Sequence, residues 1–144
     1  MSDPISIIAN QFPKVVIPLV ESALESINII VYDWRWYPTV NGSDVSKFNQ
    51  AICEASKRGV KVQCLVNNQG VADRLRLAGC EAKLLHSKKL LHTKILIVDN
   101  VKVVIGSHNY TASAFGANEE ASVLVTMPEE NNDFVKYFNA LWGV

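Results

Sequence analysis

Hydrophobic positions along the chain change repeatedly between helical spacing and short continuous runs. The apolar residues from 15 to 24 recur every three or four positions, which is typical of an amphipathic helix. The next run, 27–34, is short and rich in β-branched and aromatic residues, which predicts a buried strand. The predicted elements are helices at 14–26, 44–58, 71–78 and 128–141, and strands at 27–34, 60–66, 82–85, 93–98, 101–105 and 122–126.

The order of these elements predicts the fold class. Strands that alternate with helices in a chain of 144 residues indicate a single α/β domain over residues 1–144, layered as an α/β/α sandwich. Ser43 is a candidate cap for the second helix, and Gly59 is its candidate stop. The pair at 99–100, Asp-Asn, is typical of a tight hairpin turn, so at least one strand pair is antiparallel and the β-sheet is mixed.

The hairpin around residues 99–100 brings four polar side chains together. If those two residues alone form the turn, His92 lies directly opposite Ser107. Side chains two positions apart share a face of a strand, so Lys94 and Asn109 join the same cluster. A shift of the strand register by one residue would divide this cluster between the two faces of the sheet.

The cluster has the chemistry of a phosphate site. Lys94 supplies a compact positive charge, while Ser107 and Asn109 supply neutral hydrogen-bond donors. His92 supplies a nucleophile or proton carrier that works near neutral pH. Gly106 leaves room where the backbone approaches a ligand.

Two residues near this cluster are expected to be structural. Asp99 follows Lys94 by five residues, or about 16 Å along an extended strand, so the two side chains cannot contact one phosphate. Aspartate is favoured in tight turns, which indicates a role for Asp99 in the hairpin. His108 points to the opposite face from Asn109, so it too is expected to support the fold.

Composition narrows the possible functions. Basic and acidic residues number 14 each, and a net charge of zero excludes binding of nucleic acid or anionic membrane by bulk positive charge, but not by a local cluster. A hydrophobic content of 49% excludes a disordered chain. The three cysteines form no CxxC pair, so we expect reduced thiols in the core and no zinc site. We see no signal peptide and no apolar stretch of about 20 residues, so we expect a cytoplasmic protein without a membrane span.

The polar motifs together resemble those of the phospholipase D superfamily. Its HxKx4D pattern stands here as His92, Lys94 and Asp99. Its GSxN element stands at 106–109, and its N-x-E element at 118–120. The flanking pattern of helices and strands is compatible with the superfamily's fold over nearly the whole chain, so the resemblance implies a phospholipase D-like fold.

The resemblance also implies a metal-independent phosphodiesterase that needs no cofactor. In that chemistry one histidine attacks phosphorus and forms a phosphohistidine, and a second histidine protonates the leaving oxygen. Glu120, or alternatively Glu119, would orient His92 through its second ring nitrogen. The implied roles are catalytic for His92, Lys94, Asn109 and Glu120, phosphate-binding for Lys94, Ser107 and Asn109, and structural for Asp99 and Gly106.

The chain carries a single copy of the motif, because His86 and His108 lack the accompanying lysine spacing. One histidine cannot be nucleophile and acid at the same time, since its reacting nitrogen is bonded to phosphorus. Short members of the superfamily pair two chains. We therefore expect a homodimer in which two copies of His92 face each other across a two-fold axis.

Three kinds of function stay open. Short single-motif members of the superfamily are mostly nucleases, so cleavage of DNA or RNA is the leading hypothesis. A phospholipase or other small-diester phosphodiesterase is one alternative, and a non-catalytic nucleic-acid-binding module is another. Lys88, Lys89 and Arg35 could guide a polyanion to the site. Trp36 could stack on bases, although packing of the aromatic segment 34–37 in the protein is the alternative.

Overall fold

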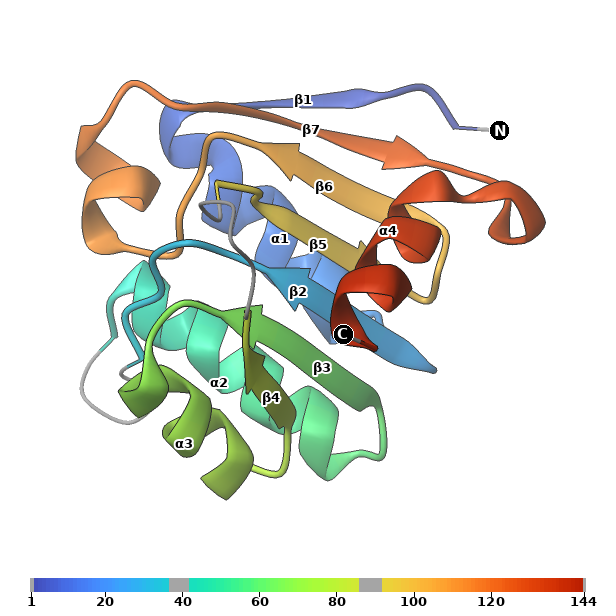
Figure 1. Cartoon of the computed structure of the whole chain (residues 1–144). Helices are drawn as coiled ribbons and strands as arrows, with labels where there is room; N and C mark the ends of the chain where they lie inside the picture. Colours follow the sequence, from blue (N-terminus) through green and yellow to red (C-terminus); the bar gives the residue numbers. More distant parts are fainter. Residues whose placement is uncertain (1, 37–41, 86–91, 144) are drawn as a thin grey trace.

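The computed structural model describes residues 2–36, 42–85 and 92–143, which form one mixed sheet with helices on both faces (Figure 1). In these residues the sheet has seven strands in the order β1-β7-β6-β5-β2-β3-β4. The strands are β1 (Ile5–Ile8), β2 (Ser26–Ile30), β3 (Lys61–Val66), β4 (Glu81–Leu84), β5 (Ile95–Val98), β6 (Lys102–Gly106) and β7 (Ala121–Thr126). The helices are α1 (Phe12–Glu21), α2 (Asp44–Lys57), α3 (Gln69–Leu77) and α4 (Asp133–Trp142), with short helical turns η1 (Ala9–Gln11), η2 (Ser113–Ala117) and η3 (Glu129–Asn131).

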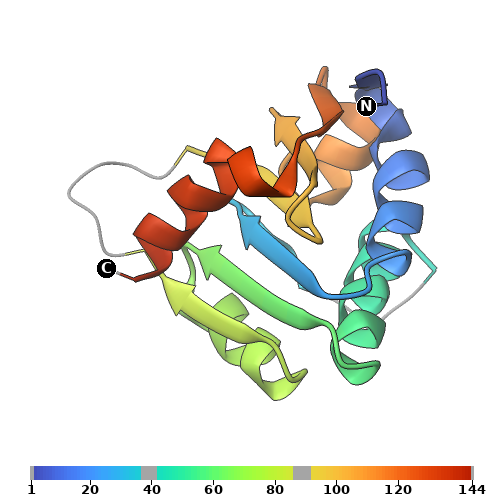
Figure 2. The ribbon, with the colours of Figure 1, turned by 90° about the vertical axis from the view of Figure 1, so that its right-hand side faces the viewer.

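The sheet combines a parallel part with an antiparallel part. β2, β3 and β4 run parallel to one another, whereas β5, β6, β7 and β1 each pair antiparallel with their neighbours. Helices α1, α2 and α3 cover one face, and α4 covers the other (Figure 2). The α/β fold class, the layered arrangement and the mixed sheet predicted from the sequence are therefore confirmed.

Apolar side chains fill the space on both faces of the central strands. In β2, Ile29 faces the large core under α1, α2 and α3, while the adjacent Ile30 faces the smaller core under α4. Phe48 of α2 is fully buried in the large core, and Phe138 of α4 in the small one. A strand buried on both faces is apolar at successive positions, which explains the continuous hydrophobic run read in the sequence.

Helix boundaries agree with the sequence where a cap is present. The Ser43 side chain accepts a hydrogen bond from the Ser46 amide at 3.2 Å and begins α2, and Gly59 follows its end with φ of +96°. Helix α1 begins at Phe12, two residues before the predicted start, and ends five residues before the predicted end. It ends at Glu21, where the Arg58 guanidinium donates to the carbonyls of Val20, Glu21 and Ala23 at 2.9–3.1 Å.

Two elements at the ends of the chain differ from the expectation. β1 was not predicted, because its stability comes from pairing with β7 more than one hundred residues later in the chain. The last helix was expected to begin at Pro128, but η3 intervenes and α4 begins at Asp133. There the Asn132 side chain accepts from the Phe134 amide at 3.0 Å and caps the helix.

The β5–β6 hairpin has a register one residue away from the predicted one. Val98 pairs with Lys102 and Ile95 with Ile105, so Lys94 continues the ladder opposite Gly106. Asp99 and Asn100 have positive φ values of 53° and 63°, and the Val101 amide donates to the Val98 carbonyl at 3.2 Å. Val101 is an additional residue in the turn, because its carbonyl accepts from the Met127 amide at 2.8 Å instead of joining the ladder. The prediction that Asp99 and Asn100 alone form the turn is wrong for this reason.

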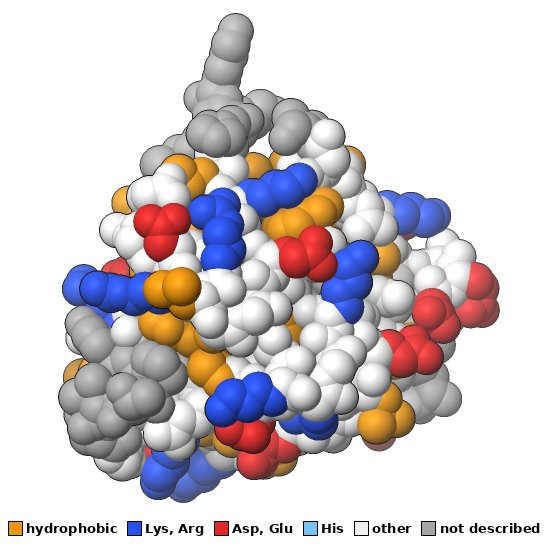
Figure 3. Space-filling model, turned by 90° about the horizontal axis from the view of Figure 1, so that it is seen from below, with side chains coloured by type: hydrophobic (Ala, Val, Ile, Leu, Met, Phe, Trp, Pro, Cys, Tyr) orange, Lys and Arg blue, Asp and Glu red, His pale blue; other side chains and the backbone are white. Residues whose placement is uncertain are grey.

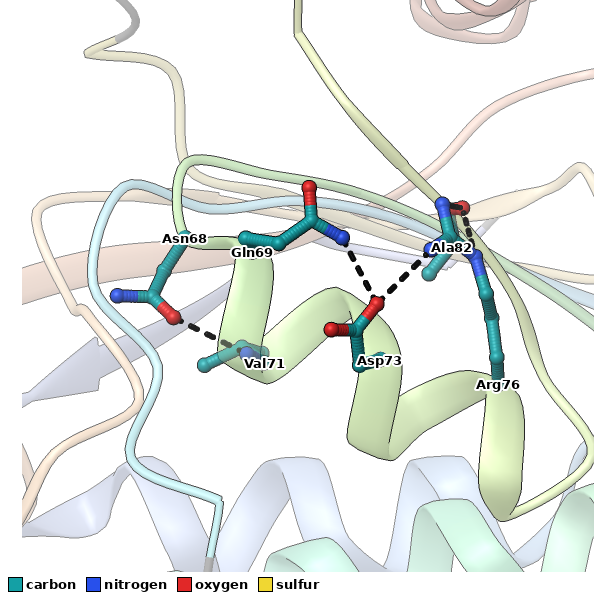
Figure 4. A network of polar contacts seen from close by, with 6 residues as sticks. All are labelled: Asn68, Gln69, Val71, Asp73, Arg76 and Ala82. Atoms are coloured by element: carbon teal, nitrogen blue, oxygen red, sulfur yellow. Dashed lines mark hydrogen bonds and ion pairs between the residues drawn. The ribbon is translucent and has the colours of Figure 1, made fainter.

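The edge strand β4 is joined to α3 by a polar network (Figure 4). The Arg76 guanidinium donates to the Ala82 carbonyl at 2.6 and 2.9 Å and forms an ion pair with Asp73 at 3.2 Å. Gln69 donates to the same Asp73 carboxylate at 2.7 Å. An edge carbonyl that already accepts from arginine is less available to another strand, so this network protects the sheet edge.

The length and hydropathy of a helix determine whether it can cross a membrane. Among residues 2–36, 42–85 and 92–143, no helix is long and apolar enough to cross a bilayer.

Candidate active site

The candidate residues lie on four segments that meet at one edge of the sheet (Figure 1). Segment 92–94 leads into β5, and segment 118–120 leads into β7. Segments 31–36 and 107–112 follow β2 and β6, respectively. Because β5 is antiparallel to both β2 and β6, and β7 is antiparallel to β6, these starts and ends share one edge. The directions of the strands therefore keep the candidate residues together, although the register of the β5–β6 hairpin is shifted by one residue.

Ser107 and Glu120 form the most tightly bonded part of this edge. The Ser107 hydroxyl donates to Oε1 of Glu120 at 2.5 Å and accepts from the Ala121 amide at 3.0 Å. Asn118 donates to the other carboxylate oxygen of Glu120 at 3.1 Å. The single proton of the Ser107 hydroxyl is therefore used on Glu120, which differs from the expectation that it donates to a phosphate.

Asn109 is held beside the segment that follows β2. Its Oδ1 accepts from the Asp33 amide at 3.1 Å. The neighbouring Tyr110 amide donates to the Asp33 carbonyl at 3.0 Å, and the Tyr110 carbonyl accepts from the Arg35 amide at 3.0 Å. With its oxygen fixed in this way, Asn109 has its amide NH₂ group left to donate to a ligand.

His92 and Lys94 lie side by side at the start of β5. The His92 ring is exposed and lies 5.7 Å from the Tyr32 ring, centroid to centroid. Lys94 is half-buried, and its Nζ donates to the His92 carbonyl at 3.1 Å. The pair thus places an accessible imidazole beside a lysine ammonium group that is held by the backbone.

Among the described residues the Glu120 carboxylate accepts from Ser107 and Asn118 and not from His92, so the orienting role that the resemblance implied stays a prediction. Both of its carboxylate oxygens are occupied, one by Ser107 and the other by Asn118. Glu119, the alternative, is exposed. In this structure, then, the acidic residue organises the loop after β6.

Asp99 and Gly106 both support the backbone around the site. The Asp99 carboxylate accepts from the amides of Leu24, Glu25 and Ser26 at 2.7–3.2 Å, so it fixes the chain that enters β2. At Gly106, an added Cβ would overlap the backbone of Ser122 and the carbonyl of Ala121 in β7. The close approach that excludes a side chain here is between strands.

His108 is buried, with 2% of its surface exposed, and both ring nitrogens have partners. Nδ1 lies 2.7 Å from the Ser122 hydroxyl, and Nε2 lies 2.8 Å from the Ala9 carbonyl. Because a carbonyl only accepts, Nε2 carries a proton. The ring also stacks on Phe12 with centroids 4.7 Å apart. His108 thus connects the loop after β6 to the end of β1 and to β7.

The expected contacts to a polyanion are only partly accessible. Arg35 has 59% of its side chain exposed and pairs with Asp33 at 3.4 Å. Trp36 is only 6% exposed and packs edge-on against Trp34, so its ring is not available to stack on a base. The proposed base contact of Trp36 is therefore corrected in favour of packing. Lys88 and Lys89 lie outside the described residues.

An open pocket of about 430 Å³ adjoins the Asn109 and Glu120 side chains. Asp33, Arg35 and Asn118 also line it. Asp33 lies inside the predicted strand 27–34 and was not expected to contribute to the site, but β2 ends at Ile30 and Asp33 belongs to the segment that follows it. In the parts of the chain that the structure describes, no group of three or more His, Cys, Asp or Glu side chains is arranged to hold a metal ion.

The cysteines are poor candidates for a nucleophile. Burial raises the pKa of Cys80 from 9.0 to about 12 and raises that of Cys64 well above 9.0. Burial also raises the pKa of the partly exposed Cys53. All three thiols are free, and a protonated thiol is a weak nucleophile.

Comparison with known proteins connects this geometry to one family. Residues 16–142 match the family model described as cardiolipin synthase, PLD-like domain. The chain is 29% identical over 118 residues to phospholipase D of Rickettsia prowazekii (strain Madrid E), covering 78% of this chain and 53% of that protein. It is 28% identical over 129 residues to mitochondrial cardiolipin hydrolase of Chlamydomonas reinhardtii, covering 85% and 54%. The chain thus spans about half the length of these curated relatives.

Two solved structures share the fold over almost their whole length. NucT from Helicobacter pylori superposes with a TM-score of 0.79 at 21% identity, covering 98% of this chain and 96% of that one. Nuc from Salmonella typhimurium, a phospholipase D family member, superposes with a TM-score of 0.76 at 24% identity, covering 98% and 95%. The fold of this chain therefore extends over almost the whole of both solved chains.

Proposed function

Because this chain belongs to the PLD-like domain family, within the phospholipase D superfamily, we propose that it is a metal-independent phosphodiesterase that acts as an endonuclease on DNA or RNA. One observation carries the proposal. An exposed His92 beside a fixed Lys94 lies at the same sheet edge as the hydrogen-bonded Ser107, Asn109 and Glu120. That edge combines a nucleophile, a positive charge and the amide donor of Asn109, and an open pocket adjoins Asn109 and Glu120.

The first step of the proposed reaction is attack by His92. A ring nitrogen of His92 forms a bond to phosphorus, and the bond from phosphorus to the leaving oxygen breaks. The leaving oxygen takes a proton from His92 of the partner subunit. Lys94 and the Asn109 amide bind the non-bridging oxygens, on which negative charge develops.

The second step regenerates the enzyme. A water molecule gives its proton to His92 of the partner subunit and its oxygen bonds to phosphorus, while the bond between nitrogen and phosphorus breaks. The sum is hydrolysis of one phosphodiester, with both histidines returned to their starting states. Imidazole suits both roles because its ordinary pKa lies near neutral pH.

The need for a second histidine supports a shared site. His108 is buried with both ring nitrogens engaged, so it is not free to act as the acid. His86 lies outside the described residues and lacks the motif's lysine spacing. A second copy of this chain supplies the missing group most simply, in a symmetric homodimer with one composite site.

Two observations favour nucleic acid as the substrate. Nuc and NucT, whose names indicate nucleases, are covered by this chain over 95% and 96% of their length. The pocket beside Asn109 is lined mostly by polar side chains, which do not suit an acyl chain.

Acidic and basic side chains are interspersed on the face seen in Figure 3, and the net charge is zero. Binding therefore depends on local contacts and is expected to be modest and salt-sensitive.

A lipid or small-diester phosphodiesterase is the second candidate. It is favoured by the names of the curated relatives, phospholipase D and mitochondrial cardiolipin hydrolase. Those proteins are about twice as long as the aligned region, so their substrates do not transfer directly to this chain.

The test compares wild type, His92→Ala and the exposed-site control Lys57→Ala on single-stranded DNA, duplex DNA, RNA, cardiolipin vesicles and bis(p-nitrophenyl) phosphate. We expect wild type and Lys57→Ala to cleave nucleic acid equally with or without EDTA, and His92→Ala to be inactive. Turnover of cardiolipin with inert nucleic acid would select the second candidate. Binding of nucleic acid with no turnover of any diester would indicate a non-catalytic module, and loss of activity in EDTA would contradict the mechanism.

The shared site has its own test. Wild type and His92→Ala are co-refolded at varied ratios, and the mass of the assembly is measured by sedimentation. If each site needs two His92 residues, activity falls with the square of the wild-type fraction. A linear fall, or a monomeric mass under assay conditions, would contradict the shared site.

A further inference from the structure

The open pocket next to Asn109 has a lining that selects for a particular kind of substrate group. It measures about 430 Å³, near the small end of the roughly 300–1,000 Å³ range of ligand pockets. Its walls come from the segment after β2, the loop after β6 and the segment before β7. The polar side chains that matter here are Asp33, Arg35, Thr111, Ser113 and Asn118.

Asp33 and Arg35 are fixed close to Asn109, the residue proposed to bind the phosphate. The Asp33 amide donates to Oδ1 of Asn109 at 3.1 Å, and the Asp33 carbonyl accepts from the Tyr110 amide at 3.0 Å. The Arg35 amide is likewise bonded to the Tyr110 carbonyl at 3.0 Å. These backbone hydrogen bonds therefore hold the Asp33–Arg35 ion pair beside Asn109, the residue proposed to bind the phosphate.

The ion pair is open to a ligand. The Asp33 and Arg35 side chains are 40% and 59% exposed, and Nε of Arg35 lies 3.4 Å from the carboxylate. Surface pairs of this kind contribute little to stability, so this pair is not required to hold the fold. A carboxylate that only accepts and a guanidinium that only donates together complement a ligand that carries both kinds of group.

These features fit a nucleoside better than a lipid tail. A sugar hydroxyl or a base amine can donate to Asp33, while base nitrogens, base oxygens or a neighbouring phosphate can accept from Arg35. An acyl chain in the same place would leave these polar groups without partners, at a cost of about 1–3 kcal/mol each. A bare phosphate is disfavoured by the adjacent carboxylates of Asp33 and Glu120.

On the basis of the phosphodiesterase function above, we propose that this pocket binds the nucleoside on one side of the scissile phosphate, with Asp33 and Arg35 as its specificity-determining residues. The pocket then distinguishes a polynucleotide from a diester whose flanking group is small or apolar. Neither residue takes part in bond breaking.

The experiment compares Asp33→Asn and Arg35→Gln on an oligonucleotide and on bis(p-nitrophenyl) phosphate, which has no nucleoside. Asp73→Asn is the matched control, because Asp73 also forms an exposed ion pair with an arginine, Arg76 at 3.2 Å, but on α3 (Figure 4). We expect each pocket variant to lower kcat/KM for the oligonucleotide at least ten-fold more than for the small diester, mainly through KM. An equal loss on both substrates, or no loss on the oligonucleotide, would overturn the proposal.

A binding measurement separates this proposal from the proposed catalysis. Deoxyguanosine 5′-monophosphate and glycerol 1-phosphate are each titrated into wild type and Asp33→Asn, and amide shifts of Thr111 and Ser113 are followed by NMR. We expect the nucleotide to bind at these positions and to bind at least five-fold more weakly to the variant. If wild type cleaves no diester but shows this pattern, the catalytic proposal fails and the pocket stands. Equal nucleotide affinity in both proteins, or equal binding of glycerol 1-phosphate, would refute the pocket.

Discussion

The hydroxyl of Ser107 donates a 2.5 Å hydrogen bond to Glu120, and this bond links the loop after β6 to the start of β7. The two residues lie close together because the ladder that pairs Gly106 with Ser122 brings Ser107 opposite Ala121, the residue after Glu120. The Ser107 amide also donates to the Ala121 carbonyl at 3.0 Å. The Glu120 carboxylate is therefore held by Ser107, whose only hydroxyl proton is used on this bond.

Replacing Ser107 with alanine is expected to affect turnover more than substrate binding. The variant loses a hydrogen bond to a charged group, typically worth about 1.5–3 kcal/mol, and releases Glu120 from its fixed position. We predict that kcat on bis(p-nitrophenyl) phosphate falls about ten-fold or more while KM changes little. Steady-state kinetics and a thermal melt measure the two effects.

Ser22→Ala is the control for this variant, because it also removes a hydroxyl with one short hydrogen bond, to the Leu19 carbonyl at 2.6 Å, but far from the site in sequence. It should leave kcat unchanged. A rise in KM with normal kcat in Ser107→Ala would instead assign Ser107 to phosphate binding.

Asp99 is expected to matter for stability and not for chemistry, although it belongs to the same sequence motif as His92. Its carboxylate accepts from the amides of three consecutive residues, Leu24, Glu25 and Ser26. We predict that Asp99→Ala lowers the free energy of unfolding by about 1–3 kcal/mol, because these charge-assisted bonds are lost. Urea unfolding at pH 7 measures this change.

The activity of the folded Asp99→Ala protein is the deciding second measurement. At a temperature where it remains folded, kcat per folded molecule should equal that of wild type. A variant with unchanged stability but much lower kcat would place Asp99 in the reaction.

Elements with strong local signals could be predicted from the sequence. Ser43 begins α2 because its side chain bonds to a nearby amide, and Gly59 follows the helix because its φ of +96° suits glycine. Both features depend only on residues a few positions apart. β1 could not be recognised in this way, since its partner β7 lies more than one hundred residues away.

The candidate site was foreseeable as a set of residue types but not as a set of contacts. The cluster was inferred from a hairpin register that proved one residue off, because Val101 accepts from Met127 outside the ladder. The residues still share one edge, because strand direction and not register determines which ends meet. The bond between Ser107 and Glu120, and the place of Asp33 in the pocket, depend on loops that leave the ladder after Gly106 and Ile30. Sequence periodicity carries no information about such loops.

Gly106 is expected to tolerate no side chain. A Cβ at this position would overlap the Ser122 backbone and the Ala121 carbonyl, so β6 and β7 would have to separate next to Glu120. We predict that Gly106→Ala lowers the free energy of unfolding by more than about 2 kcal/mol, since overpacking of this kind typically costs 1–3 kcal/mol or more. Gly116→Ala is the matched control, because nothing lies within 4 Å of its added Cβ. Equal stability of the two variants would show that β7 moves aside freely.

Stability is expected to fall steeply above pH 9, because buried acids keep their protons in the folded state. Burial raises the pKa of Cys80 to about 12 and that of Cys64 well above its ordinary 9.0, and it also raises the pKa of Tyr110 above 10.0. The unfolded chain releases these protons near the ordinary values. A raised pKa in the folded state thus gives stability that is complete below pH 9 and is lost as the pH rises.

The size of this loss follows from linkage. Each buried thiol contributes about 1.4 kcal/mol per pH unit above 9, so wild type should lose about 2–3 kcal/mol between pH 8 and pH 10. Urea unfolding under reducing conditions at both pH values measures the difference. In the Cys64→Ala/Cys80→Ala variant the decline should shrink to the part due to Tyr110 and Cys53, whatever the variant's absolute stability. An equally steep decline in that variant would mean that the two thiols titrate at ordinary pH in the folded protein and are not held protonated by burial.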